Sequence, residues 1–333
     1  MELSSSSPSP LPLSKPVSLP RDAAADQEHA RTSLGERQMW QKVKRVMRHN
    51  LSGYLFLLPA LLVFALFVWY PLILGFIISF QNVDMINPAI WVGLANFRAV
   101  FADRLFAIGW RNTLEYTGYA LLFGYAVPLI LALLINEMRH GKGYFRLAYY
   151  LPVMMSPIVS AFLWRWIYSP DSGLLNTLLS LIHLPGALWL ETPATALPAL
   201  VVIVTWGNAG STILIYLAAL QGVPASHYEA AEIDGASLWR RLWHVTLPNI
   251  RPIMLLMLIL QVIATMQIFT EPFAITGGGP QNSTITIVEL IYNYAFVYDD
   301  FGRASAIGVL LFLALAVFAL IYMRMTRRSM EGD

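Results

Sequence analysis

Residues 229–236 read Glu-Ala-Ala-Glu-Ile-Asp-Gly-Ala, and they form a charged island in an apolar chain. Two long apolar runs, 197–220 and 253–269, flank this island. Glu, Ala, Leu and Arg favour helix, so we expect a short helix that starts near Pro224 and closes at Pro248. A polar helix between two membrane spans fits a docking site for a soluble partner. An ordinary solvated connecting loop would fit the pattern equally well.

The composition as a whole indicates a membrane protein. Of the 333 residues, 57% are hydrophobic and only 13% are charged, against about 25% charged in soluble domains, and the mean hydropathy is +0.57. The absence of cysteine excludes a disulfide, a thiolate metal site and a cysteine nucleophile. A net charge of +2 is too small to indicate nucleic acid as a partner.

The first fifty residues differ from the rest of the chain. Residues 1–36 are rich in Ser and Pro and poor in apolar side chains, which predicts a disordered cytoplasmic tail. Residues 37–50 form a basic juxtamembrane segment, either an amphipathic helix on the membrane surface or a simple positively charged flank. No apolar stretch precedes this segment, so we expect no signal peptide.

Apolar runs that could cross a bilayer, which takes about 20 residues, recur six times. The predicted spans are Leu51–Phe80, Thr113–Asn136, Leu147–Tyr168, Leu197–Leu220, Ile253–Phe273 and Ser305–Met323. The predicted fold class is therefore an all-α integral membrane protein with a six-helix transmembrane domain over residues 51–325. Residues 326–333 are expected to form a cytoplasmic C-terminal tail.

Lys and Arg are distributed unequally between the two sides of these spans. Residues 1–50 hold eight of them, and nine more fall on the same side: Arg139, Lys142, Arg146, Arg240, Arg241, Arg251, Arg324, Arg327 and Arg328. The other side holds only Arg98, Arg104, Arg111, Arg165 and Arg303. Because cytoplasmic loops carry the excess of Lys and Arg, both termini and the 229–236 island are expected in the cytoplasm.

The three outer connections, 81–112, 169–196 and 271–304, are too short for a folded domain. Apolar residues in the second connection recur at helical spacing, namely Leu174, Leu175, Leu178, Leu179 and Ile182. This spacing predicts a short helix that lies at the outer membrane interface.

Motifs for catalysis are missing from the sequence. No phosphate-binding loop of the Gly-x-x-x-x-Gly-Lys-Ser/Thr type occurs, and Gly277-Gly278-Gly279-Pro280 fits a flexible outer turn better. The six histidines are scattered without metal-ligand spacing. We therefore expect no enzyme activity, no metal and no cofactor in this chain.

Two predicted spans carry neutral polar residues on one face. Asn208, Ser211 and Thr212 stand at positions i, i+3 and i+4, and Gln261 and Thr265 stand four residues apart. Polar groups in hydrocarbon are costly unless they meet a partner or a water-filled path. These groups either hydrogen-bond helices to one another or bind the hydroxyl groups of a sugar, and the two interpretations weigh about equally.

The charged island, followed by Leu247-Pro248, resembles the EAA signature of binding-protein-dependent ABC importer permeases. Further segments resemble the carbohydrate-uptake branch of that family in the same order: Asn112-Thr113-Leu114, Gly143-Tyr144-Phe145-Arg146, Leu151-Pro152, Trp164-Arg165-Trp166, Pro170-Asp171-Ser172-Gly173-Leu174-Leu175-Asn176, Thr276-Gly277-Gly278-Gly279-Pro280 and Phe301-Gly302-Arg303-Ala304-Ser305-Ala306. The resemblance runs from Ser52 to the C-terminus. The span number resembles the six-span lactose, oligosaccharide and glycerol-phosphate permeases rather than the maltose permease, which has extra spans and a large periplasmic insert.

The resemblance implies a type I ABC importer permease fold with a cytoplasmic coupling segment at 224–250. The implied ATPase-coupling residues are Glu229, Ala230, Ala231, Asp234, Gly235, Ala236, Leu247 and Pro248. Positions that match sugar contacts in the family are Gly207, Asn208, Ser211, Gln261 and Thr265. The implied location is the bacterial cytoplasmic (inner) membrane.

The resemblance also implies the other components of a transport complex. These are a second permease subunit, two ATPase subunits that bind ATP and Mg, and an external solute-binding protein that delivers a sugar or oligosaccharide. Importer permeases for another polar solute, such as glycerol-3-phosphate, share the same motifs. A secondary transporter would need an ionisable group in mid-membrane, whereas the charges in these spans lie near their ends. A receptor or scaffold would not need the 224–250 segment to engage an ATPase.

Overall fold

The computed structural model describes residues 51–138 and 140–330. The predictions for the tail 1–36 and the juxtamembrane segment 37–50 therefore lie outside the described residues. The chain divides into two compact units, 1–71 and 72–333. The first unit contains α2 (Leu51–Phe64) and a π-helical turn, η1 (Ala65–Trp69), and α3 (Tyr70–Ile78) begins at its end.

The second unit consists almost entirely of helices, which confirms the all-α class. In chain order, α3 is followed by β1 (Gln81–Asn82), β2 (Ile90–Trp91), α4 (Ala95–Ala102), α5 (Arg104–Ala120), η2 (Leu121–Tyr125), α6 (Ala126–Glu137), α7 (Lys142–Tyr150), η3 (Leu151–Met154), α8 (Pro157–Ile167), α9 (Leu174–Leu181), α10 (Pro193–Gln221), α11 (Ala225–Ile233), α12 (Leu238–Arg241), η4 (Leu242–Thr246), α13 (Leu247–Met266), η5 (Pro272–Thr276), α14 (Ile287–Tyr292), η6 (Asn293–Val297) and α15 (Phe301–Met330). The two short strands pair antiparallel, with Gln81 opposite Trp91.

Five helical stretches within the described residues are long and apolar enough to cross a membrane: Leu55–Ile78, Arg104–Glu137, Pro193–Gln221, Leu238–Met266 and Phe301–Arg324. They correspond to the first, second, fourth, fifth and sixth predicted spans. Several boundaries differ from the prediction. The second span begins at Arg104, α13 ends at Met266 rather than Phe273, and α15 continues to Met330 beyond the expected end at Met323.

The predicted third span, Leu147–Tyr168, is not a single straight helix. The stretches Lys142–Met154 and Pro157–Ile167 are long and apolar enough to cross a membrane only when taken together, and they are bent by 104° relative to each other. Ser156 between them is extended, with ψ of 138°. A proline disfavours the helical conformation of the residue before it, so Pro157 explains the break. The six-span prediction holds when this bent pair counts as one span.

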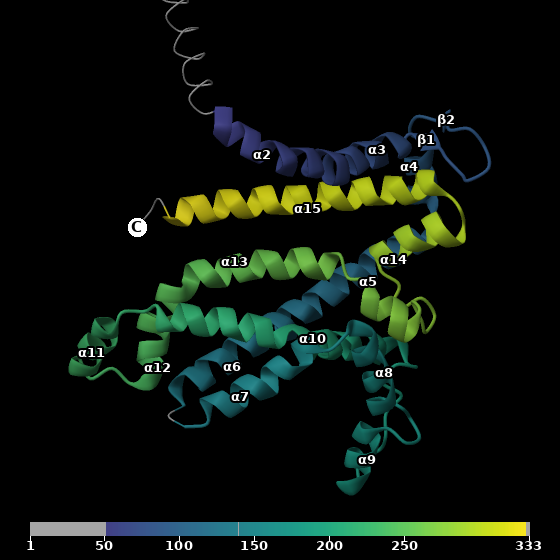
Figure 1. Cartoon of the computed structure of the whole chain (residues 1–333). Helices are drawn as coiled ribbons and strands as arrows, with labels where there is room; N and C mark the ends of the chain where they lie inside the picture. The colour runs from purple at the N-terminus through teal and green to yellow at the C-terminus, as the bar shows by residue number, and fades with distance from the viewer. Residues whose placement is uncertain (1–50, 139, 331–333) are drawn as a thin grey trace, which may run out of the picture. The chain divides into compact units, whose positions relative to one another are not determined.

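Helix α10 is the central helix of the second unit. It packs against α5, α6, α8 and α13 (Figure 1). Side chains on several of its sides are buried, among them Leu200, Ile203, Ile213 and Tyr216. A helix that is apolar on most of its sides fits such a surrounded position.

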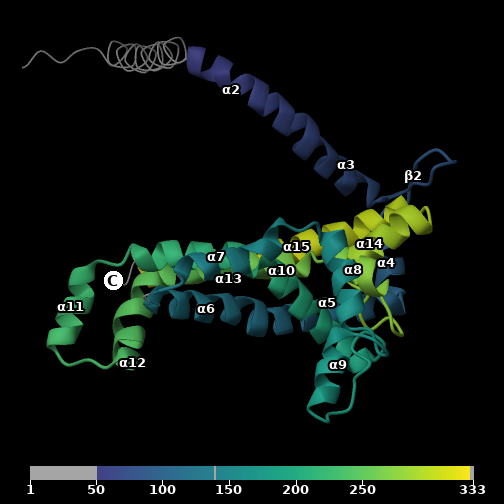
Figure 2. The same ribbon diagram turned by 60° about the horizontal axis from the view of Figure 1, so that its bottom comes forward.

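The two ends of the second unit differ in character. Figures 1 and 2 show α11 and α12 at one end and α8 and α9 at the other. Helix α9 (Leu174–Leu181) is the short helix that the leucine spacing at residues 174–182 predicts. The charged island and the predicted outer connections therefore lie at opposite ends of this unit, as the orientation argument requires.

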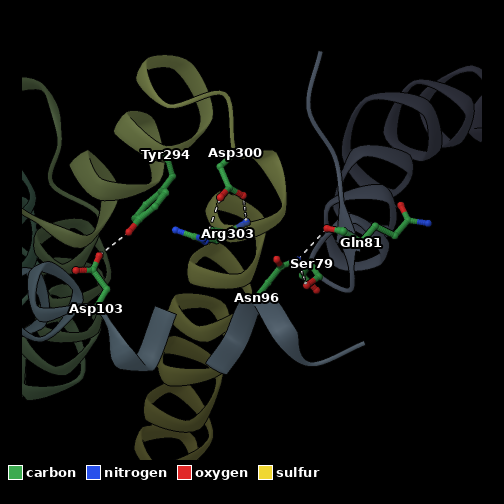
Figure 3. Close-up of polar contacts among 7 residues, drawn as sticks. All are labelled: Ser79, Gln81, Asn96, Asp103, Tyr294, Asp300 and Arg303. Atoms are coloured by element: carbon green, nitrogen blue, oxygen red, sulfur yellow. Dashed lines mark hydrogen bonds and ion pairs between the residues drawn. The ribbon is translucent and has the colours of Figure 1, made fainter. Parts of the chain in front are cut away.

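Buried polar contacts hold the end of this unit that carries α4 (Figure 3). The side-chain amide of Asn96 in α4 donates to the carbonyl oxygens of Ser79 (3.0 Å) and Gln81 (2.8 Å). Gly302 in α15 lies directly beside them, since a Cβ atom there would come 2.4 Å from the Gln81 carbonyl oxygen. Only glycine permits this close approach of α15 to the end of α3.

Asp103 connects α5 to the segment before α15. Its carboxylate caps α5 by accepting from the Leu105 N–H at 2.9 Å, and it accepts a second hydrogen bond from the Tyr294 hydroxyl (Figure 3). Burial, followed by the Asp103 contact, raises the pKa of Tyr294 to about 12. Arg303 pairs with Asp300 at 3.1 Å and lies over the Tyr294 ring, 5.9 Å from its centroid.

Candidate functional site

The 224–250 segment forms a helical hairpin at one end of the second unit (Figures 1 and 2). Helix α11 begins directly after Pro224, as predicted, and α12 follows a short turn. Gly235 lies in that turn at φ +69°, a conformation that glycine adopts without strain. Glycine at this position is a common helix terminator. The expectation that the helix runs through Gly235 to Pro248 is therefore wrong, because Gly235 ends α11.

The base of the hairpin also differs from the prediction. Pro248 does not close the segment; it is the second residue of α13 and directly follows the π-helical turn η4. Helix α12, the π-helical turn η4 and α13 run on as one helical stretch, Leu238–Met266. The hairpin is therefore directly continuous with the fifth span, and a movement of α12 would be transmitted to that span.

The hairpin presents apolar and acidic side chains to its surroundings. Ile233, Leu238 and Trp239 are 88%, 69% and 68% exposed. Glu232 of α11 pairs with Arg241 of α12 at 3.3 Å, which ties the two arms together. Exposed apolar side chains rimmed by charge are typical of a protein-binding surface.

The predicted coupling residues lie together on this hairpin. Glu229, Ala230 and Ala231 belong to α11, Asp234, Gly235 and Ala236 form the turn, and Leu247 and Pro248 begin α13. Glu229, Asp234 and Gly235 are exposed. The docking of these residues onto an ATPase stays a prediction.

A cavity of about 350 Å³ lies between α5, α10 and α13. Its polar lining residues are Tyr116, Thr205, Asn208, Ser211, Thr212, Gln261, Thr265 and Glu271, and the remainder of the wall is apolar apart from Gly124. A largely apolar wall with a few convergent polar groups is the usual character of a small-molecule site.

Four of the five predicted sugar-contact residues line this cavity: Asn208, Ser211, Gln261 and Thr265. Gly207 is not among the lining residues, although it precedes Asn208. Thr265 is 4% exposed, and its hydroxyl donates to the Gln261 carbonyl at 2.9 Å within the same helix. Its single hydroxyl proton is therefore already used within the helix. The Asn208 amide also donates within its own helix, to the Val204 carbonyl at 3.1 Å, but it keeps a second N–H and its side-chain oxygen for a ligand. Contact between these residues and a sugar stays a prediction.

Among the lining residues that were not predicted from the sequence, Gly124, Tyr116 and Glu271 bear most on the site. Gly124 lies in η2, where a Cβ atom would come 2.8 Å from Nε2 of Gln261. Tyr116 is fully buried, and its hydroxyl has no hydrogen-bond partner within the described residues. Glu271 lies beyond the end of α13 at Met266 and directly precedes η5. The expected fifth span ended at Phe273, two residues beyond Glu271. A carboxylate inside an expected span was the one feature of the sequence that could have indicated a functional role for Glu271.

A family model described as "Binding-protein-dependent transport system inner membrane component" matches residues 122–331. This range contains the hairpin and most of the cavity wall. The chain belongs to this permease family. Its relatives include the trehalose/maltose transport system permease protein MalF of Thermococcus litoralis, 34% identical over 83% of this chain and 93% of that protein. The arabinooligosaccharides transport system permease protein AraP of Bacillus subtilis is 32% identical over 85% of this chain and 90% of that protein.

Solved structures show the same permease architecture. A chain of a bacterial ABC transporter involved in the import of the acidic polysaccharide alginate is similar with a TM-score of 0.77 and 28% identity. The match covers 86% of this permease and 99% of that chain. The same transporter in complex with an alginate pentasaccharide-bound periplasmic protein also has a TM-score of 0.77. The chain therefore has the type I importer permease fold.

Proposed function

We propose that this permease is one membrane-spanning subunit of an ATP-driven importer that moves a sugar or oligosaccharide into the bacterial cytoplasm. The observation that carries the proposal is a connection within the second unit. The cavity is lined by α10 and α13, and the exposed hairpin of α11 and α12 joins these two helices. A force applied to the hairpin would therefore act on both helices that form the cavity wall.

The partners follow from this arrangement and from the relatives. An ATPase subunit binds the exposed hairpin and supplies ATP and Mg, since the chain carries no phosphate-binding loop. A second permease subunit completes the substrate path, and a second ATPase subunit binds it. An external binding protein delivers the substrate. The structure of the alginate transporter in complex with a substrate-bound periplasmic protein supports this partner. The substrate class is supported by the trehalose/maltose and arabinooligosaccharide permeases.

In the proposed orientation, the hairpin and both termini lie in the cytoplasm. The distribution of Lys and Arg supports this orientation. The hairpin then faces the compartment that holds ATP, and α9 at the opposite end of the unit faces outward.

A cysteine reporter tests orientation and docking together, because the natural chain has no cysteine. Ser237 at the start of α12 and Ser180 in α9 are both exposed, whereas the hydroxyl of Ser283 in an outer connection is buried. We expect a membrane-impermeant maleimide to label Ser237→Cys only from the cytoplasmic side and Ser180→Cys only from outside. Ser237→Cys should also crosslink to the ATPase subunit. Labelling of both positions from the same side would overturn the proposal.

A further inference from the structure

The cavity wall carries an acidic side chain but no basic one. Among its lining residues there is no Lys, Arg or His, and Glu271 is the one carboxylate. The other polar groups are neutral amides and hydroxyls, which bind sugars without regard to charge. The sign of the cavity's charge therefore depends on Glu271.

Glu271 is half-buried and lies just past the end of α13, before η5. Within the part of the chain that the structure describes, no Lys, Arg or His forms an ion pair with it. Burial raises the pKa of its carboxyl, against a smaller opposing contribution from its own backbone N–H. A carboxylate in such a position is weakly screened by solvent and acts on any charge that enters the cavity.

Tyr116 gives an independent indication that this cavity is built for a ligand. It is fully buried and lines the same cavity, and its hydroxyl has no partner within the described residues. Buried polar groups are almost always hydrogen-bonded, so an unpaired hydroxyl on a cavity wall is available to a ligand. A sugar hydroxyl can accept from Tyr116 and donate to Glu271.

We propose that Glu271 is a charge-selectivity residue, which restricts the cavity to neutral or positively charged saccharides and rejects those that carry a carboxylate or phosphate. This inference rests on the proposed function and narrows its substrate class. It sets this permease apart from its structural relative in the importer of the acidic polysaccharide alginate. It also excludes glycerol-3-phosphate as the solute.

The test uses the complete complex with both permease subunits, because the second subunit forms the remainder of the path. Maltotriose and arabinotriose are first tested for ATP-driven uptake in vesicles, and the better substrate is chosen. Its aldonate, made by oxidation of the reducing end, adds one negative charge. Its 1-amino-1-deoxy derivative adds one positive charge. Dissociation constants of the parent sugar, the aldonate and the amino derivative are then measured by saturation-transfer NMR. The complex used lacks the external binding protein, so that this protein does not select among the three compounds.

The wild-type complex is expected to bind the aldonate about tenfold or more weakly than the parent sugar. Glu271→Gln, which keeps the shape and removes the charge, should bring the two constants to within about twofold of each other and weaken binding of the amine. Glu289→Gln is the matched control, since it makes the same change at a buried carboxylate outside the cavity lining. In this control, the ratio of the aldonate's dissociation constant to that of the parent sugar should be the same as in the wild type.

The possible failures are distinguishable. Absence of ATP-driven uptake of both sugars would contradict the proposed function itself. Uptake with equal binding of parent sugar and aldonate by the wild type would overturn the selectivity role without any variant. An unchanged ratio in a correctly assembled Glu271→Gln complex would overturn it as well.

Discussion

Gln261 lies directly against Gly124, so that a Cβ atom at position 124 would come 2.8 Å from its Nε2 atom and 3.2 Å from the hydroxyl oxygen of Thr205. This contact joins η2 to α13 across the wall of the cavity. The Gln261 amide is the end of a flexible side chain, so it can move aside, but it then moves within the space that a substrate would occupy.

Gly124→Ala is therefore expected to reduce sugar uptake several-fold while leaving membrane insertion and complex assembly intact. Gly124→Val should reduce uptake further. Gly118→Ala is a matched control in the preceding α5, because nothing lies within 4 Å of a Cβ atom there. Uptake and assembly are compared for the three variants. Equal uptake by Gly124→Val and Gly118→Ala would show that the contact has no part in transport.

Substitution of the polar cavity residues tests the substrate path directly. Asn208→Leu or Gln261→Leu removes partners for sugar hydroxyls, and each unsatisfied buried polar group costs about 1–3 kcal/mol. The transport step should slow by roughly one to two orders of magnitude. Thr265→Val should have a smaller effect, because the Thr265 hydroxyl already donates within its own helix.

The measurement is uptake beside receptor-stimulated ATP hydrolysis in the assembled complex. Sugar binding by the external protein should not change, because that site lies on another polypeptide. Wild-type uptake by both Leu variants would mean that these side chains only connect helices.

The turn at Gly235 offers a test of energy coupling. Its φ of +69° strains any residue with a Cβ atom, although nothing lies within 4 Å of one. Gly235→Pro fixes φ near −65°, so it should disrupt the hairpin and release or uncouple the ATPase. Gly235→Asn should retain most coupling because Asn tolerates this conformation.

Co-purification of the ATPase with each variant, together with uptake, measures this effect. Gly143→Ala in α7 serves as a control with an unobstructed Cβ atom and without a positive φ. Unchanged co-purification and uptake in Gly235→Pro would refute the docking role of the hairpin.

The sequence predicted the apolar spans and the polar face of α10, for elementary reasons. Hydropathy over about 20 residues is a strong signal, and residues 208, 211 and 212 must share a face once the segment is helical. The 104° break in the third span was missed because its two halves form one continuous apolar run. Pro157 was visible, but prolines also occur within intact spans, as Pro198 does in α10.

The cavity's other residues could not be predicted from spacing. The approach of Gly124 to Gln261 joins residues more than a hundred positions apart, and no local pattern encodes it. Glu271 lay where the predicted fifth span, 253–273, and the predicted outer connection, 271–304, overlap, and neither prediction assigned it to a ligand site. Gly235 was assigned to a helix because its neighbours favour helix, whereas its own backbone conformation ends that helix.

Glu289 in α14 makes stability depend on pH. Glu289 is 2% exposed, and its Oε2 atom has no hydrogen-bond partner within the described residues. Burial raises the pKa of its carboxyl from 4.5 to about 7. A raised acid pKa means that ionisation opposes folding. The contribution of this carboxyl to stability should therefore be highest below pH 4.5, fall as the pH rises to about 7, and stay level above that.

Glu289→Gln cannot ionise, so its thermal midpoint should change less than that of the wild type between pH 5 and pH 8. The wild type should lose stability over the same interval. Thermal unfolding of both proteins in the same detergent measures the difference, and parallel curves would show that Glu289 does not titrate in the folded protein.

In the proposed function, ATP hydrolysis on a partner subunit drives sugar through this permease. The most direct measurement is uptake of maltotriose and arabinotriose by vesicles that hold the full complex, with the external binding protein present and ATP supplied on the hairpin side. We predict accumulation of at least one sugar that requires ATP and the binding protein and is unaffected by collapse of the proton gradient. Uptake that proceeds without ATP and stops when the proton gradient is collapsed would mean that this permease is a secondary transporter.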